Sequence, residues 1–315
     1  MELGGTLKLL LDKALKTNTQ RTYSSAQKRF LKFCILYDLT PCPATEQTLL
    51  YFVSYLFSDG LKGSSIRCYL SAVRNLHIAN DIQYIGVTPK LQMALKGACV
   101  LSDPPRRMKP INFAMLSKMI LLLKGRSDSN MLSAALSLGF FGCLRSGEFC
   151  LPDAGVFDPT IHLRIKDVTL LKDEKMFSLL LKVSKTDKHS QGVTVFVGCS
   201  GAFACAYCSM RRFLISRKGV SSDDPLFQDK YGNLLRRSYL ISTIKILVSM
   251  LGLDPTDYSG HSLRAGAATT GADLGFENWE IQLLGRWTSD AYQLYLRNPK
   301  LLATFANRLA RPSHS

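Results

Sequence analysis

A proline-rich, basic segment in the first half of the chain limits what this sequence can fold into. The segment is Ser102–Pro110, SDPPRRMKP, and its prolines disfavour helix in the residues that precede them. Helical patterns stand on both sides of it, so we expect a break between two domains. A length of 315 residues agrees with about two domains. We therefore predict a first domain over residues 1–101, a linker over 102–111 and a second domain over 112–315.

The first region has the pattern of an all-helical domain. Amphipathic helices are expected over residues 1–16, 17–36, 45–57, 61–77 and 88–100. Pro41 and Pro43 break the chain, and Pro89 stands in the first turn of a helix, where its missing N–H costs nothing. A lysine interrupts the short apolar stretch at the start, which argues against a signal peptide. No apolar run approaches the roughly 20 residues of a membrane span, so no membrane partner is expected.

The second region mixes helices with a small sheet. Helices are expected over 113–124, 129–142 and 201–216, with more towards the end, and strands over 161–171, 176–184 and 192–198. Phe177, Leu179, Leu181 and Val183 alternate with other residues, as half-buried strands require. The predicted fold class is therefore mainly α (α+β), with one small three-stranded antiparallel sheet in the second domain.

The charge balance points to a polyanionic partner. Lysine and arginine number 40 against 24 acidic residues, which gives a formal net charge of +16 and a pI near 9.5. Such an excess is typical of nucleic-acid binding. Basic residues interleaved with hydroxyl side chains suit a surface laid against double-stranded DNA. The candidate DNA-binding residues are Arg21, Lys28, Arg29, Lys32, Lys62, Arg67, Arg74, Arg106 and Arg107.

The nine cysteines are scattered through apolar contexts and are expected to be reduced thiols. One pair has a metal-like spacing, Cys205-x-x-Cys208, with Cys199 shortly before it. No second pair of cysteines or histidines completes a zinc motif. Packing on a helix face is therefore the favoured interpretation, with zinc as the less favoured alternative.

The stretch Tyr258–Arg297 carries the chemistry. It contains His261 and Arg264, which lie on one face if the segment is helical, followed by Gly285-Arg286-Trp287 and two tyrosines. A separate Leu-Arg-x-x-Glu upstream supplies Arg145 and Glu148. Two arginines, a histidine, a lysine and a tyrosine are what metal-free transfer of a phosphoryl group to a protein hydroxyl needs.

In these residues the chain resembles the tyrosine recombinase (phage integrase) family. The stretch Ser-Gly-His-Ser-x-Arg-x-Gly-Ala-Ala (Ser259 to Ala268) carries the likeness, and so do Trp287 and Tyr295-x-Arg-Asn. The form Gly-Arg-Trp-x-Ser-Asp-Ala-Tyr-x-x-Tyr is closer to the recombinases of DIRS-type retrotransposons and cryptons. The order of the motifs matches the family, and an ordered set is far more specific than any one motif.

The resemblance implies a site-specific recombinase that cleaves and rejoins DNA through a 3′-phosphotyrosyl intermediate. No cofactor is implied, because the covalent bond to tyrosine stores the phosphodiester energy. Arg145 and Arg264 would clamp the phosphate, His261 would donate a hydrogen bond to it, and Glu148 would orient these groups. Trp287 occupies a position where many members have a second histidine; pure core packing is its alternative.

Two assignments stay open. The nucleophile is predicted to be Tyr295 from its spacing to Trp287, with Tyr292 as the rival. The lysine that protonates the departing 5′ oxygen is predicted to be Lys185, in the turn between the last two strands, with Lys182 and Lys188 as rivals.

Further expectations rest on the resemblance alone. The first domain would be a core-binding domain that forms a clamp around DNA with the catalytic domain, and a homo-tetramer would assemble on two DNA sites. Localisation in the nucleus is expected from the likeness to eukaryotic mobile-element recombinases. Two alternatives remain: a catalytically inactive DNA-binding derivative, and a relaxase that resembles type IB topoisomerases.

Overall fold

The computed structural model describes residues 3–15, 17–104, 107–183 and 192–287, together with Ser289 and Gln293. The chain divides into two compact units, Met1–Arg106 and Arg107–Ser315. The division falls inside the segment expected to link two domains. Within the described residues, every helix is too short or too polar to cross a lipid bilayer.

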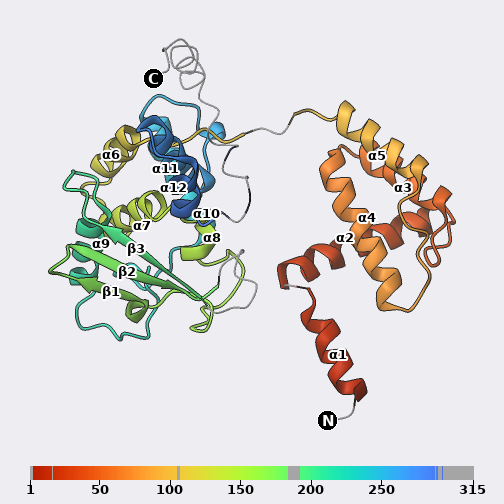
Figure 1. Ribbon diagram of the computed structural model, residues 1–315, viewed down its shortest axis with the longest axis horizontal. Coiled ribbons are helices and arrows are strands. Elements are labelled where there is room, and N and C mark those ends of the chain that lie inside the picture. Colours follow the sequence, from red (N-terminus) through yellow and green to blue (C-terminus); the bar gives the residue numbers. More distant parts are fainter. Residues whose placement is uncertain are drawn as a thin grey trace, which may run out of the picture. The chain divides into compact units, whose positions relative to one another are not determined.

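Unit 1 is helical throughout its described part (Figure 1). Its helices are α1 (Leu3–Lys13), α2 (Thr17–Leu36), α3 (Glu46–Ser58), α4 (Gly63–Ala79) and α5 (Pro89–Leu101). Thr45 and Thr88 cap α3 and α5, because each side chain accepts a hydrogen bond from a backbone N–H in the first turn. The core forms where α2, α3 and α4 meet, around the buried rings of Phe30, Phe33 and Phe52.

The last residues of the expected linker belong to the packed part of unit 2. The backbone N–H of Ile111 donates to the carbonyl of Ser262 at 2.9 Å, and Ile111 is fully buried. Lys109 forms an ion pair with Asp257 at 2.7 Å. This close approach depends on Gly266, where an added Cβ would lie 1.8 Å from the carbonyl oxygen of Ile111.

Unit 2 combines helices with a small sheet (Figure 1). Strands β1 (Val168–Leu171), β2 (Met176–Leu181) and β3 (Val193–Gly198) pair antiparallel in the order β1-β2-β3. Phe177 stands opposite both Leu170 and Val197. The helices are α6 (Phe113–Leu122), α7 (Ser129–Phe141), α8 (Ser146–Phe149), α9 (Ala206–Ser216), α10 (Arg237–Met250), α11 (His261–Asp273) and α12 (Asn278–Gly285). The predicted α-dominated α+β class is confirmed.

The sheet is smaller than the sequence predicts. The first strand was expected over 161–171 but begins at Val168, because residues 165–167 form a 3-10 helix. That turn is stabilised by the backbone N–H of Arg164, which donates to the Asp167 carboxylate at 2.7 Å.

The helix expected from residue 201 begins at Ala206, with Cys205 as its N-cap. The preceding residues form a loop, within which the Ser200 hydroxyl donates to the carbonyl of Ala204 at 3.4 Å.

Candidate active site

The first catalytic candidate lies in the turn after α7. That helix ends at Phe141, and Cys143 adopts a left-handed backbone with a φ of 47°. The chain thereby reverses into α8, with Arg145 as the residue before its first turn. Glu148 folds back onto this turn: its carboxylate accepts from the backbone N–H of Arg145 at 2.8 Å and from the Arg145 guanidinium at 3.1 Å. One acidic side chain therefore positions both the backbone and the side chain of Arg145.

Helix α11 carries both His261 and Arg264. Its small residues let it lie buried among its neighbours, and Gly260 at its start approaches Ser146 of α8 so closely that a Cβ would lie 2.7 Å from the serine hydroxyl. Arg264 faces inward and is 1% exposed, whereas His261 lies exposed in the first turn of the helix. The predicted helical spacing of this pair is thus present, with the arginine as the inner member.

Two segments hold the Arg264 guanidinium, the turn after α7 and the end of α12. One of its nitrogens donates to the carbonyl of Cys143 at 2.5 Å, and another donates to the carbonyl of Gly285 at 2.6 Å. The guanidinium also lies over the Trp287 ring, 4.2 Å from its centroid, as a cation–π contact requires. Gly285 is necessary for this stack, because a Cβ there would lie 1.7 Å from the indole ring.

A third arginine joins the cluster, and sequence reasoning did not give it a role. Arg286 follows α12 in a left-handed backbone conformation with a φ of 54°. This backbone aims its guanidinium at the turn that carries Arg145. It donates to the carbonyl of Gly142 at 3.1 Å and forms an ion pair with Glu148 at 3.4 Å. The signal in the sequence is the position of Arg286 in Gly-Arg-Trp, directly before the tryptophan to which a site role was assigned.

The described part of the site carries an excess of positive charge, since the guanidinium groups of Arg145 and Arg286 pair with the Glu148 carboxylate and Arg264 lies within electrostatic range of it. Burial lowers the pKa of both Arg264 and Arg286, because desolvation disfavours a charged group. Both remain protonated at neutral pH, since arginine does not deprotonate in proteins. Burial also raises the pKa of the Cys143 thiol to about 11, so this cysteine stays neutral. The arrangement suits an oxyanion with more than one exposed oxygen.

The structure brings together Arg145, Glu148, Arg264 and Trp287, which sequence reasoning had taken from three separate segments. Trp287 is 8% exposed and packs on Arg264, so packing is at least part of its role. Other predicted residues lie outside the described part of the chain, namely Arg106, Lys185, Lys188, Tyr292 and Tyr295.

Lys182 is bound within the fold. Its ammonium group forms an ion pair with Asp167 at 2.5 Å and donates to the carbonyls of Pro159 and His162, both at 2.9 Å. The side chain is only 12% exposed. These contacts join the end of β2 to the segment before β1, which gives Lys182 a structural role.

The basic faces expected in unit 1 are present on two helices. Arg21 and Lys28 line a hollow of about 450 Å³ on α2 together with Ser24 and Ser25. On α4, Arg67 and Arg74 line a second hollow, of about 530 Å³, with Lys96 of α5.

Other candidate DNA-binding residues differ in their surroundings. Lys32, Lys62 and Arg107 are exposed. Arg29 is half-buried: it pairs with Asp59 and lies over the rings of Tyr55 and Tyr69. It therefore contributes to the packing of α2 against α3 and α4, a role that its charge alone did not indicate.

Comparison with known proteins gives one curated relative and several solved structures. No family model matches the chain. The integrase/recombinase xerD homolog of Selenomonas ruminantium is 23% identical over 290 residues, which span 89% of this chain and 81% of the relative.

Several of the similar structures are of recombinases or integrases bound to DNA. The Tn1549 transposon integrase in complex with transposon right end DNA has a TM-score of 0.65 at 14% identity, and the match covers 97% of this chain and 98% of that one. The XerH site-specific recombinase in a pre-cleavage complex with difH has a TM-score of 0.61 at 18% identity, over 90% of this chain and 78% of that one. A lambda integrase dimer on a COC′ core site has a TM-score of 0.58 at 18% identity, over 93% of each chain.

These likenesses agree with the residues of the site. The structures share the fold of this chain over nearly its whole length, and the curated relative matches most of its sequence. Of the converging arginines, Arg264 and Arg286 belong to the motifs that carry the family resemblance, and Arg145 belongs to the separate upstream motif. Taken together, these comparisons show that the chain is similar to recombinases and integrases in sequence and in fold, in agreement with the resemblance of its motifs to the tyrosine recombinase family.

Proposed function

We propose that this protein is a site-specific DNA recombinase of the mobile-element type, which breaks and rejoins DNA through a tyrosine. The observation that carries the proposal is the cluster of three guanidinium groups around one carboxylate, built from the turn after α7, from α11 and from the end of α12. A phosphodiester is the anion in DNA that such a cluster fits, because arginine forks pair with its two non-bridging oxygens.

The arginines differ in how they reach a phosphate. Arg145 and Arg286 have side chains that are 22% and 16% exposed, so both can meet a phosphate from the solvent side. Arg264 is only 1% exposed. It can contact a phosphate directly only if residues that shield its guanidinium from solvent move when DNA binds. Its charge acts on the same phosphate in either case, because the field of a buried cation is screened less than that of an exposed one.

The reaction follows from a phenol, a held phosphate and a proton donor. The phenol of Tyr295 gives up its proton to solvent as its oxygen attacks phosphorus, and the bond from phosphorus to the 5′ oxygen breaks. Negative charge grows on the non-bridging oxygens, where the arginines stabilise it. The departing 5′ oxygen takes its proton from a lysine. A 5′ hydroxyl, from the same or a second duplex, then reverses the sequence and releases the tyrosine.

The contacts of Lys182 bear on the choice of general acid. With its ammonium group held by Asp167 and two carbonyls, Lys182 would have to leave three partners to reach a substrate. Lys185 is therefore the proposed acid, and Lys188 is the remaining rival. A comparison of single Lys→Ala variants on substrates with a 5′ sulfur leaving group separates them, because that leaving group needs no proton. Only the variant that lacks the true acid should regain activity on it.

Unit 1 is proposed to bind the DNA duplex through α2 and α4. The exposed pairs Arg21 with Lys28 and Arg67 with Arg74 are each seven residues apart, so each pair occupies one helix face. Serines stand between them on both faces, as phosphate contacts favour.

We further propose that four chains assemble on two DNA sites and that the protein acts in the nucleus. Light scattering of the purified protein–DNA complex and imaging of a tagged chain test these two points.

The decisive experiment traps the covalent intermediate. Purified protein is incubated with a pool of nicked duplexes of randomised sequence, so that the released strand diffuses away and the adduct accumulates. A band of slower mobility on a denaturing gel is expected, and peptide mass should place the DNA on Tyr295. Tyr295→Phe should abolish the band, while Tyr292→Phe, the matched control, should retain it.

The alternatives make different predictions in the same assay. An inactive DNA-binding derivative would bind the pool and yield no adduct with any variant. A relaxase would relax supercoiled plasmid, and its adducts would show no shared sequence when recovered and sequenced. Adducts that map to Tyr292 would overturn the assignment of the nucleophile and leave the reaction intact.

A further inference from the structure

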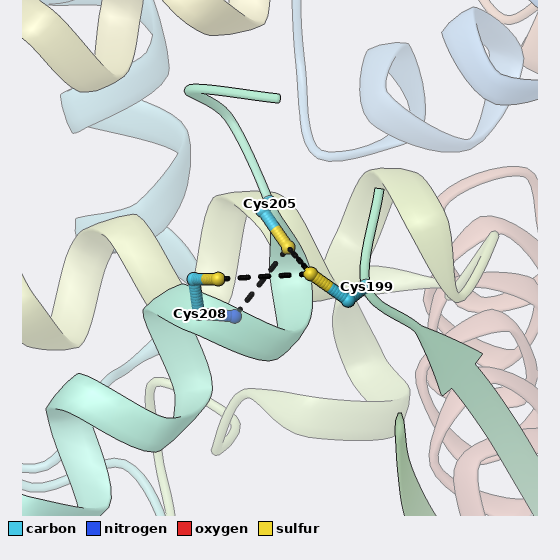
Figure 2. Close-up of side chains that lie close together, drawn as sticks. All are labelled: Cys199, Cys205 and Cys208. Atoms are coloured by element: carbon cyan, nitrogen blue, oxygen red, sulfur yellow. Dashed lines mark hydrogen bonds between the residues drawn. The ribbon is translucent and has the colours of Figure 1, made fainter. Parts of the chain in front are cut away.

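Three cysteines of unit 2 converge at the junction between the sheet and α9, and neither the proposed reaction nor the DNA-binding faces use them. Cys199 directly follows β3, Cys205 is the N-cap of α9, and Cys208 lies in the first turn of that helix. Figure 2 shows the three sulfur atoms pointing towards one another. The sequence favoured packing on a helix face for these residues, and packing alone does not account for sulfur atoms that meet at one point.

We propose that Cys199, Cys205 and Cys208 bind one zinc ion, which ties the end of β3 to the first turn of α9. The sulfur of Cys199 lies 3.5 Å from that of Cys205 and 3.8 Å from that of Cys208, and all three lie within 4.8 Å of one another. With zinc–sulfur bonds of about 2.3 Å, the edge of a tetrahedral site is about 3.8 Å. The ion therefore fits between the sulfur atoms with little movement of the chain.

The first turn of α9 is suited to thiolates. The backbone N–H of Cys208 donates to the Cys205 sulfur at 3.5 Å, and the positive end of an eleven-residue helix faces the same atom. Thiolates are the ligands that zinc prefers, and the three thiols would release their protons to solvent on binding.

The loop that carries the first two ligands is held independently of any metal. The backbone N–H of Cys199 donates to the carbonyl of Lys175 in the β1–β2 turn at 2.8 Å. Within the loop, the ring of Phe203 lies under the ammonium group of Lys124, 5.4 Å from the ring centroid. These contacts keep the backbone in place, so the proposed ion would find a largely preformed site.

The fourth position is open. No further histidine, cysteine or carboxylate belongs to the group in the part of the chain that the structure describes. Cys208 is exposed, so water can complete the tetrahedron. Three protein ligands and an exchangeable fourth should release zinc to a chelator faster than a closed four-cysteine site does.

A disulfide is the competing use of these residues. It would join two of the sulfur atoms at about 2.05 Å and leave the third cysteine without a role. The structure instead places the Cys199 sulfur at comparable distances from both others, as a shared metal requires. Zinc is therefore the proposed occupant, and a disulfide is an outcome that the experiment can detect.

The full-length chain is purified without chelator in two portions. One portion is kept free of reductant, so that peptide mass can detect a native disulfide, and the zinc content of the other, kept under a phosphine reductant, is measured by mass spectrometry. About one zinc ion per chain is expected. After removal of the metal, titration with Co²⁺ should produce sulfur-to-cobalt charge-transfer absorption and the strong visible bands of a tetrahedral site. Removal of zinc should also lower the melting temperature, because binding to the folded state stabilises it.

Single variants assign the ligands. Cys199→Ser, Cys205→Ser and Cys208→Ser should each bind zinc at least tenfold more weakly, while Cys68→Ser, a half-buried cysteine on α4, should bind it as the parent does. Circular dichroism checks that each variant folds. If Cys205→Ser does not fold, the cobalt spectrum of the parent still tests whether a tetrahedral thiolate site is present.

Three results would overturn the proposal. They are a reduced parent chain that binds neither zinc nor cobalt, full binding by both Cys199→Ser and Cys208→Ser, and a native disulfide within the trio that leaves no metal site after reduction. None of these results bears on the trapping of a DNA adduct, so the zinc site and the recombinase proposal can fail separately.

Discussion

Glu148 is the residue on which the geometry of the candidate active site depends. Its carboxylate accepts from the backbone and side chain of Arg145 and pairs with Arg286, while its own side chain is only 5% exposed. Without it, three guanidinium groups would face one another with no counter-charge between them. A phosphate could then still be attracted, but the arginines would no longer be held in one arrangement before it arrives. We therefore assign Glu148 a positioning role.

The first prediction concerns this carboxylate. Glu148→Gln should keep the fold but lower the rate of adduct formation by about 10²-fold, the effect of losing one preorganised stabilising group. Quantitation of the adduct over time on the nicked pool measures it. Glu174→Gln, in the exposed turn between β1 and β2, is the matched control and should react as the parent does. Equal rates for both variants would remove Glu148 from the site.

At the scale of elements, the small residues of α11 determine how closely the chain packs around the site. Gly260 touches α8, and Gly266 touches the backbone of Ile111. Such contacts bring Arg145 and Arg264, which lie far apart in sequence, within electrostatic range of each other. The helix is buried on nearly all sides, and for that reason its apolar residues show almost no amphipathic pattern.

The second prediction compares two helical glycines with opposite outcomes. Gly266→Ala should destabilise unit 2 by about 2–3 kcal/mol, because its Cβ meets a backbone oxygen that cannot move aside. Gly97→Ala, at an exposed position of α5 with open space around it, should stabilise unit 1 by about 0.5–1 kcal/mol. Both tryptophans lie in unit 2, so their fluorescence reports its unfolding in urea, and circular dichroism reports both units. A neutral effect of Gly266→Ala would contradict the observed docking of residues 109–111.

The third prediction concerns the contact between α7 and α10. Asp128, before α7, accepts hydrogen bonds from Arg126 and from the Tyr239 hydroxyl of α10. Burial alone would raise the pKa of Asp128, but these two donors outweigh it, and the pKa is lowered from 3.8. The stability that Asp128 provides is therefore complete above its unfolded pKa and is lost as the pH falls through the lower folded value.

Asp128→Asn should accordingly destabilise unit 2 by about 1–2 kcal/mol near neutral pH. The lower part of the usual range applies because Arg126 is 41% exposed and solvent screens it. The difference from the parent should shrink as the pH falls below 3.8 towards the lower folded pKa, at which the carboxylate of the folded parent takes up a proton. Urea titrations followed by tryptophan fluorescence at neutral and acidic pH measure this. Asp173→Asn, in an exposed turn, serves as the control.

For the whole molecule, net charge determines how binding responds to salt. The chain carries a formal charge of +16, and exposed basic faces lie on α2 and α4. Each phosphate that such a face neutralises releases counterions, so affinity falls as salt rises.

The fourth prediction follows from this charge. Affinity for a duplex of random sequence should fall by about 10³-fold or more between roughly 50 and 200 mM salt. Arg67→Gln with Arg74→Gln should make the slope of log affinity against log salt shallower by about 2, which fluorescence anisotropy can measure. Lys172→Gln with Lys218→Gln, which removes two exposed charges away from both faces, should leave the slope nearly unchanged. Identical slopes for the two double variants would refute the assignment of α4 to the DNA.

Much of the architecture could be predicted because it rests on local patterns. Helical periodicity located α2 to α7 within a few residues, and alternation indicated β2 and β3. The predicted boundaries were wrong where a side-chain hydrogen bond determines the start of an element. Asp167 forms a turn before β1, and Cys205 caps the first turn of α9. Such hydrogen bonds depend on single atoms, which a repeating pattern does not contain.

The sequence by itself determined the fold class, the residue types needed for phosphoryl transfer and the pairing of His261 with Arg264 on one helix, because all of these follow from composition and short-range spacing. Only the tertiary structure decided how individual groups are used. It added Arg286 to the site, bound Lys182 to Asp167 and brought three cysteines together. The physical reason is that the use of a charged or reactive side chain depends on which distant segments pack beside it, and that packing is a property of the whole fold.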